Sequence, residues 1–74
     1  MGKIDFHGYT KEELRLKIDS LVGNIRLNQS CQVLELVTGE GPLKQFLIRY
    51  IKINYNLNYR EIHNNSGTIL VTID

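Results

Sequence analysis

The sequence predicts one α/β domain, a two-layer sandwich in the order βαβαββ with a four-stranded mixed sheet and two helices. Two stretches, residues 11–27 and 42–54, carry apolar residues at helical spacing. Four shorter stretches have the apolar patterns of strands, and turn residues separate them. The 74 residues contain no linker or internal repeat and can build only one small hydrophobic core. We therefore expect a single domain over residues 1–74.

The first strand is predicted over residues 3–7, where apolar and polar side chains alternate. Ile4 and Phe6 share one face of this strand, because residues two apart point the same way. Asp5 and His7 share the opposite face, and Gly8 ends the strand. One face is therefore apolar, and the other carries a carboxylate and an imidazole, which can take part in acid–base catalysis or binding.

The first helix is predicted to begin directly after Thr10. Thr10 and Glu13 have the spacing of a capping box, in which both side chains accept hydrogen bonds from backbone amides at the helix start. Gly23 is a weak point, because glycine inside a helix costs about 1 kcal/mol relative to alanine. The helix should still reach about Leu27, since its apolar stripe continues that far. The stripe consists of Leu14, Ile18, Leu21, Val22 and Ile25.

The second strand and the second helix are predicted over residues 32–37 and 42–54. The strand is apolar on both faces except at Glu35, which is typical of an interior strand in a parallel sheet. The helix should start at Pro42, because proline suits the first helical position. The side chains expected to form one core are Leu14, Ile18, Leu21, Val33, Leu36, Phe46, Leu47, Ile51 and Val71.

The end of the chain has the pattern of a β-hairpin. Residues 57–63 are interpreted as the third strand and residues 68–73 as the fourth. Between them, residues 64–67 read Asn-Asn-Ser-Gly, which is the composition of a turn.

Composition narrows the classes of function. The formal net charge is only +1, so any nucleic-acid surface would have to come from the distribution of charge. No apolar run is long enough for a membrane helix or a signal peptide, and a single cysteine allows no internal disulfide, so we expect a cytoplasmic protein.

Three common kinds of site are not predicted. Cys31, His7 and His63 are too few and too scattered for a structural zinc site. The Gly-x-Ser-x-Gly elbow and the Gly-Lys-Ser/Thr end of an NTPase loop are both absent.

The segment at 38–44, Thr-Gly-Glu-Gly-Pro-Leu-Lys, joins the most apolar strand to the second helix. Glycine lets a backbone turn sharply and approach a ligand closely. The amides of the first helical turn are free, and they lie at the positive end of the helix dipole. We therefore predict an anion or phosphate site formed by Thr38, Gly39, Glu40 and Gly41. An ordinary turn between a strand and a helix is the alternative.

A second signal converges on the same place. If the first two strands are parallel, as the helix between them requires, His7-Gly8 and Thr38-Gly39 both follow the carboxyl ends of strands. Open α/β sheets bind their ligands at that edge.

The second helix and Tyr9 could add contacts to nucleic acid. The charged residues of this helix are Lys44, Arg49 and Lys52, and it has no acidic residue. Lys44, in the first turn, is the predicted phosphate contact, whereas a solvated basic face is the alternative. Tyr9 directly follows the His7-Gly8 end of the first strand and is the best candidate for stacking on a base.

The motifs together resemble those of the small MutS-related (Smr) domain. Residues 4–8 (Ile-Asp-Phe-His-Gly) are similar to the family's Leu-Asp-Leu-His-Gly, and residues 38–41 (Thr-Gly-Glu-Gly) to its His-Gly-x-Gly. Residues 66–73 are similar to its closing glycine-containing turn and apolar strand. The resemblance covers nearly the whole chain and places Asp5, His7, Gly8, Thr38, Gly39 and Gly41 in the family's motifs.

Three departures from the family pattern bear on chemistry. Thr38 stands where many relatives have histidine, so no imidazole is present there. The loop after Gly41 is shorter than the common form, and Ser66-Gly67 replaces paired glycines. A phosphate cradle of backbone amides does not depend on these side chains.

The resemblance implies a nucleic-acid-binding domain, often the C-terminal part of a larger MutS-like or RNA-binding protein. One hypothesis is a structure-selective endonuclease that nicks DNA or RNA, with Asp5 and His7 as catalytic residues and the second motif with Lys44 holding phosphate. The other is a non-catalytic module that docks a larger protein on DNA, RNA or the ribosome. We expect a monomer and no membrane partner. DNA or RNA, branched or otherwise structured, and a requirement for magnesium or manganese stay open.

Overall fold

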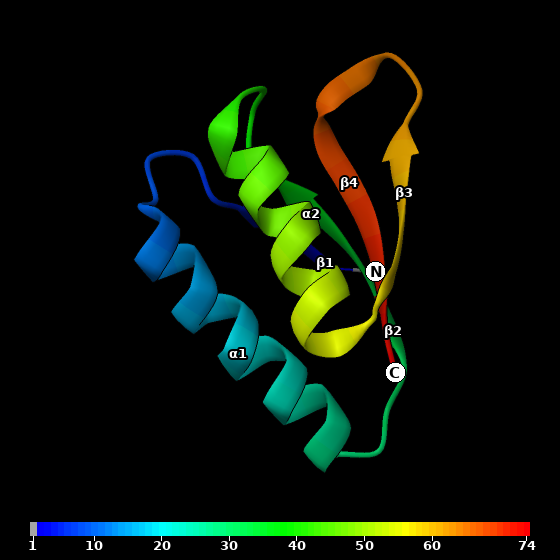
Figure 1. Ribbon diagram of the computed structural model, residues 1–74. Helices are drawn as coiled ribbons and strands as arrows, with labels where there is room; N and C mark the ends of the chain where they lie inside the picture. The colour runs from blue at the N-terminus through cyan, green and yellow to red at the C-terminus, as the bar shows by residue number, and fades with distance from the viewer. Residues whose placement is uncertain (1) are drawn as a thin grey trace.

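The four strands form one mixed sheet in the order β1-β2-β4-β3, and both helices cover the same face of it (Figure 1). The computed structural model describes residues 2–74. The elements are β1 (Gly2–Asp5), α1 (Lys11–Leu27), β2 (Gln32–Val37), α2 (Pro42–Tyr55), β3 (Asn58–Ile62) and β4 (Asn65–Ile73). The predicted two-layer βαβαββ sandwich is confirmed. Neither helix of the described chain is long and apolar enough to cross a membrane.

The strand register brings three chain segments to one end of the sheet. β1 runs parallel to β2, with Asp5 opposite Val37. β4 runs antiparallel to β2, with Thr68 opposite Val37. The ends of β1 and β2 and the beginning of β4 therefore lie at the same end of the sheet, with β2 between the other two (Figure 1). We call this end the loop edge; it consists of residues 6–9, 38–41 and 65–67.

One hydrophobic core fills the space between the helices and the sheet. The capping box is present at Thr10 and Glu13, and α1 runs to Leu27 across Gly23, as predicted. Both apolar stripes face the sheet. The buried apolar side chains are Phe6, Leu14, Ile18, Val22, Ile25, Leu34, Leu36, Leu47, Ile51, Leu57, Ile69, Val71 and Ile73.

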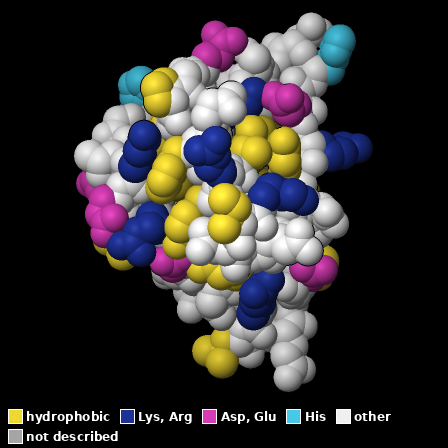
Figure 2. Space-filling model, in the orientation of Figure 1, with side chains coloured by type: hydrophobic (Ala, Val, Ile, Leu, Met, Phe, Trp, Pro, Cys, Tyr) yellow, Lys and Arg dark blue, Asp and Glu magenta, His cyan; other side chains and the backbone are white. Residues whose placement is uncertain are grey.

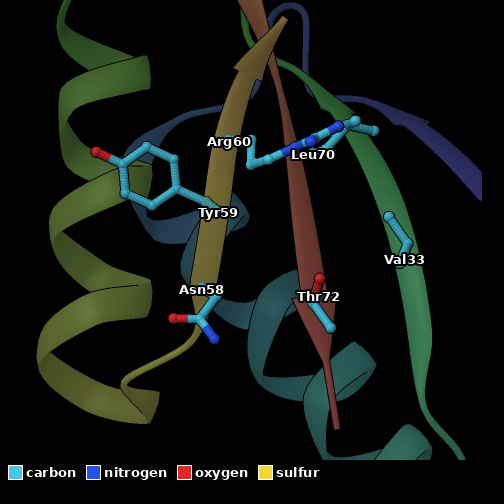
Figure 3. Close-up of a pocket in the computed structure, with 6 residues that line it drawn as sticks. All are labelled: Val33, Asn58, Tyr59, Arg60, Leu70 and Thr72. Carbon is cyan, nitrogen blue, oxygen red and sulfur yellow. The ribbon is translucent and has the colours of Figure 1, made fainter.

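The prediction that Val33 is buried is wrong, because only one face of the sheet is covered. Leu34 and Leu36 point to the helices, so Val33 points the other way and is 40% exposed. Val33 borders a shallow hollow of about 360 Å³ on the open face, together with Leu70, Thr72 and Arg60. Figure 3 shows Arg60 extending across β4 on this face.

Phe46 and Leu21 were also expected in the core. Both are only partly buried, at its rim.

The turn of the hairpin lies earlier in the chain than predicted. β3 and β4 pair as expected, but β4 already begins at Asn65, and His63-Asn64 form the turn. Asn64 has a φ of 64°, a left-handed conformation that asparagine tolerates. A bulge between Glu61 and Ile62 shifts the register beside this turn. Ser66 and Gly67 therefore belong to the strand and lie next to residues 38–40, just beyond the end of β2.

A polar clamp joins the two helices. Tyr50 and Tyr55 of α2 both donate hydrogen bonds to Asp19 of α1, with an O–O distance of 2.6 Å for Tyr50. These hydrogen bonds, first that of Tyr50, lower the pKa of Asp19. Burial is the main cause that raises the pKa of both tyrosines, and the hydrogen bond to the Asp19 carboxylate is the second. The pKa of Tyr55 rises to about 12.

Replacing Leu47 by alanine should lower the free energy of unfolding by about 2 to 5 kcal/mol, because the side chain is fully buried and its loss leaves a cavity. Leu16→Ala is the matched control. Leu16 is 56% exposed, so its truncation should change stability by less than about 0.5 kcal/mol. Urea denaturation of both variants measures the difference, and equal losses would contradict the assignment of the buried helix face.

Stability should fall as the pH rises from about 10 to about 12. The unfolded chain releases its tyrosine protons near the usual pKa of about 10, whereas folded Tyr55 holds its proton until about 12. The contribution of Tyr55 is therefore fully present below pH 10 and is lost as the pH passes its folded pKa. Tyr55→Phe should show a smaller pH dependence of unfolding in this window. The same dependence in parent and variant would argue against the clamp.

Candidate functional site

The first motif forms a tight turn at the end of β1. The Phe6 amide still bonds to the Val37 carbonyl at 2.7 Å, and the Tyr9 amide closes the turn on the Phe6 carbonyl at 2.9 Å. Gly8, with a φ of 83°, occupies the third position, where a type II turn requires a positive φ. The turn therefore depends on glycine, and it leaves His7 exposed at the loop edge.

Asp5 holds this turn through the backbone. Its Oδ1 accepts a hydrogen bond from the amide of His7 at 2.8 Å, and the two residues are both exposed. The carboxylate thus fixes the position of His7 relative to β1, which is how a short acidic side chain stabilises a turn. Tyr9 packs edge-to-face on Phe6, with ring centroids 5.1 Å apart. The Tyr9 ring thus contacts a buried core residue, while Tyr9 as a whole stays exposed.

The glycine loop is tied to β4. The amides of Thr38 and Gly39 both donate to the carbonyl of Gly67, at 2.9 and 3.0 Å. The Thr38 hydroxyl donates to the Gly39 carbonyl at 2.9 Å. Two of the amides expected to form the phosphate cradle are therefore engaged within the protein. The Ser66 hydroxyl donates to the Glu40 carboxylate and adds a second link between these segments.

Gly67 permits this close approach. A Cβ atom added at Gly67 would lie 2.9 Å from the Cα of Gly39, a distance that real contacts do not reach. Gly39 itself has a φ of 74° and needs the freedom of glycine. Sequence reasoning named Ser66 and Gly67 only as a closing turn. Their pairing with the glycine loop becomes visible only when β4 is placed beside β2.

The start of α2 does keep free donors. Gly41 precedes the helix, Pro42 has no amide hydrogen, and no side chain caps the first turn. Within residues 2–74, the amides of Leu43 and Lys44 have no hydrogen-bond partner. These two amides lie at the positive end of the helix dipole and are available to an anion, as are the amides of Glu40 and Gly41 in the loop.

Lys44 lies elsewhere than expected. Its side chain is buried between α2 and β3, and its ammonium group pairs with the Glu61 carboxylate. Tyr59 and Glu61 occupy the side of β3 that faces the helices. Lys44 reaches Glu61, so its side chain points toward the sheet. The predicted contact of Lys44 with phosphate therefore requires this ion pair to open.

Metal ligands do not gather at the loop edge. Among residues 2–74, no group of three or more His, Cys, Asp or Glu side chains could hold a metal ion. Magnesium is often held by one or two carboxylates together with phosphates of the substrate, so Asp5 alone does not make a preformed site.

Comparison with known proteins supports the fold. A search of solved structures finds the crystal structure of the Smr domain of Thermus thermophilus MutS2, with a TM-score of 0.82 and 19% sequence identity. The match covers 100% of this chain and 99% of that domain. No protein-family model matches the sequence, and no curated protein matches it significantly. The chain therefore has the Smr fold, as the motifs indicated.

Replacing Gly67 by alanine should displace the glycine loop, because the new methyl group would meet the Gly39 backbone. Large changes are expected at the amide signals of Thr38 and Gly39 in a ¹H–¹⁵N NMR spectrum, together with a lower melting temperature. Gly23→Ala is the matched control. No atom lies within 4 Å of a Cβ at Gly23, so this change should stabilise α1 by up to about 1 kcal/mol and leave the loop signals in place.

Proposed function

We propose that the chain is a nucleic-acid-binding domain that works at its loop edge, and that it cleaves phosphodiester bonds there. The observation that carries the proposal is the meeting of two motifs: the His7 turn and the glycine loop lie on paired strands, with Asp5 opposite Val37. The free amides of Leu43 and Lys44 open toward the same edge. An exposed imidazole beside anion donors suits chemistry on a phosphate.

In this reaction His7 would move the proton. His7 would act as general base or as general acid. As base, the imidazole takes the proton of the water that attacks the phosphorus, while the P–O bond to the leaving oxygen breaks and solvent protonates that oxygen. The amides at the start of α2 would stabilise the extra negative charge on the phosphate. Asp5 is a positioning residue, because its carboxylate holds the His7 amide, and its negative charge would balance the positive charge that the ring gains during the reaction.

The second candidate is a domain that binds and does not cleave. It is favoured by the engaged amides of Thr38 and Gly39, which leave few donors for a transition state, and by Glu40, which adds negative charge to the loop. Such a module would dock a larger MutS-like protein on DNA, RNA or the ribosome. Both candidates place phosphate at the loop edge, and they differ only in the chemistry.

His7→Ala should lower turnover by about 10²- to 10⁴-fold with little change in affinity, because it removes the group that transfers the proton. Asp5→Asn should also lower turnover: the amide oxygen can still accept from the His7 amide, so this variant tests the charge alone. Nicking of supercoiled plasmid and of structured RNA, with magnesium, manganese or a chelator, measures both effects.

His63→Ala is the matched control, because this exposed histidine lies in the hairpin turn and has no assigned role. Parental cleavage in both the His7 and Asp5 variants would rule out the catalytic assignment. Binding without any cleavage by the parent would favour the docking module. A parent that binds neither DNA nor RNA would refute the proposed function as a whole.

A further inference from the structure

The charges of this nearly neutral chain are separated between its two layers. The helices α1 and α2 contain seven basic and three acidic residues, whereas the strands and loops contain two basic and five acidic residues. The helical layer therefore carries a formal charge of +4 and the rest of the chain −3. Figure 2, which views the helical side, shows basic side chains interleaved with hydrophobic ones over the helices.

The acidic groups of the helical layer are all engaged by the protein itself. Glu12 pairs with Arg15, Glu13 accepts the amide of Thr10 in the capping box, and Asp19 accepts from the two tyrosines of the clamp. α2 has no acidic residue. These three carboxylates keep their negative charge, and the two helices together still carry a net charge of +4.

A groove runs over this face from the start of α2. Its first part is a shallow hollow of about 390 Å³ lined by Lys11, Pro42, Gln45, Phe46 and Arg49. Within residues 2–74, neither of its two cations takes part in an ion pair. The Lys11 ammonium lies 5.8 Å from the centroid of the Phe46 ring, so a cation and an aromatic surface adjoin.

The groove continues into a smaller, mostly apolar hollow of about 190 Å³. Phe46 and Arg49 line both parts, and Tyr50, Ile53 and Asn54 complete the second one. Phe46 and Tyr50 are stacked, with ring centroids 5.8 Å apart and an angle of 23° between their planes. Ile53 is 75% exposed. We call the two hollows together the helix groove.

We propose that the helix groove binds a single strand of nucleic acid leading to or from the loop edge. Lys11 and Arg49 contact phosphates, and the bases pack on Phe46 and the apolar second hollow. This inference rests on the proposed function and names its substrate class. A duplex conceals the faces of its bases, whereas an unpaired strand offers both phosphates and base faces to a groove of this composition.

The position of the groove fits this path. Pro42, which lines the first hollow, directly follows Gly41 of the glycine loop, so the groove begins where the loop edge ends. Its residues Pro42, Gln45, Phe46 and Arg49 have the spacing of one helix face. A strand held there would place its next phosphate beside the free amides at the start of α2.

The double variant Lys11→Gln/Arg49→Gln should weaken binding of a fluorescent oligothymidylate or oligouridylate by at least about 10-fold at low salt. Loss of two phosphate contacts should also reduce the slope of log affinity against log salt by about 1.4. Lys17→Gln removes one positive charge elsewhere on α1, where the residue is exposed, and should keep the parental affinity apart from a small general effect. Phe46→Leu, which retains an apolar side chain, should weaken binding about 5-fold or more if bases stack there.

The outcomes separate this inference from the proposed function. If the parent binds and the double variant binds equally well, the helix groove is not the path, while the loop edge keeps its assignment. If the parent binds no nucleic acid, both proposals fail. Equal affinity for a duplex of the same sequence, or for polyglutamate, would overturn the single-strand assignment, because neither probe offers free base faces. Unchanged melting temperatures in all variants exclude unfolding as the cause.

Discussion

The parallel pairing of β1 with β2 is the constraint on which the site depends. Two parallel strands need a crossover, and α1 supplies it. The pairing then carries both motifs to the same end of the sheet, because each directly follows its strand. β4 runs in the opposite direction and contributes the third segment of the loop edge. Its Gly67 carbonyl accepts hydrogen bonds from two amides of the glycine loop. The loop edge is thus a product of sheet topology more than of local loop sequence.

The sequence was sufficient for the fold because its local signals agree with one another. The capping box at Thr10, proline at position 42 and the two helical stripes each mark an element that the structure contains at nearly the same bounds. The errors have a common cause. Burial of Val33 and the position of the hairpin turn depend on which strands are neighbours and on which face is covered, and a single sequence does not state either.

The location of the candidate site could be predicted from the sequence, but its hydrogen bonds and ion pairs could not. His7 and Gly39 lie at the predicted edge, since their positions follow from strand order. Lys44 is different, because a basic residue in a first helical turn can face solvent or the sheet, and the choice depends on Glu61 of a distant strand. Arg49 was named among the basic residues of the second helix, but Lys11 was not named as a contact. Its contact with Phe46 depends on the placement of α2 beside α1, which a single sequence does not state.

The clamp between the helices connects stability to this surface. Asp19 joins α1 to α2 through Tyr50 and Tyr55, and Tyr50 also lines the second hollow of the helix groove. The donors are neutral hydroxyls and they lower the pKa of Asp19, so its carboxylate keeps its negative charge. A small domain has few residues to spare for separate tasks. Here Tyr50 both joins the two helices and forms part of the helix groove, so selection for a stable helix pair and selection for a ligand surface would act on the same residue.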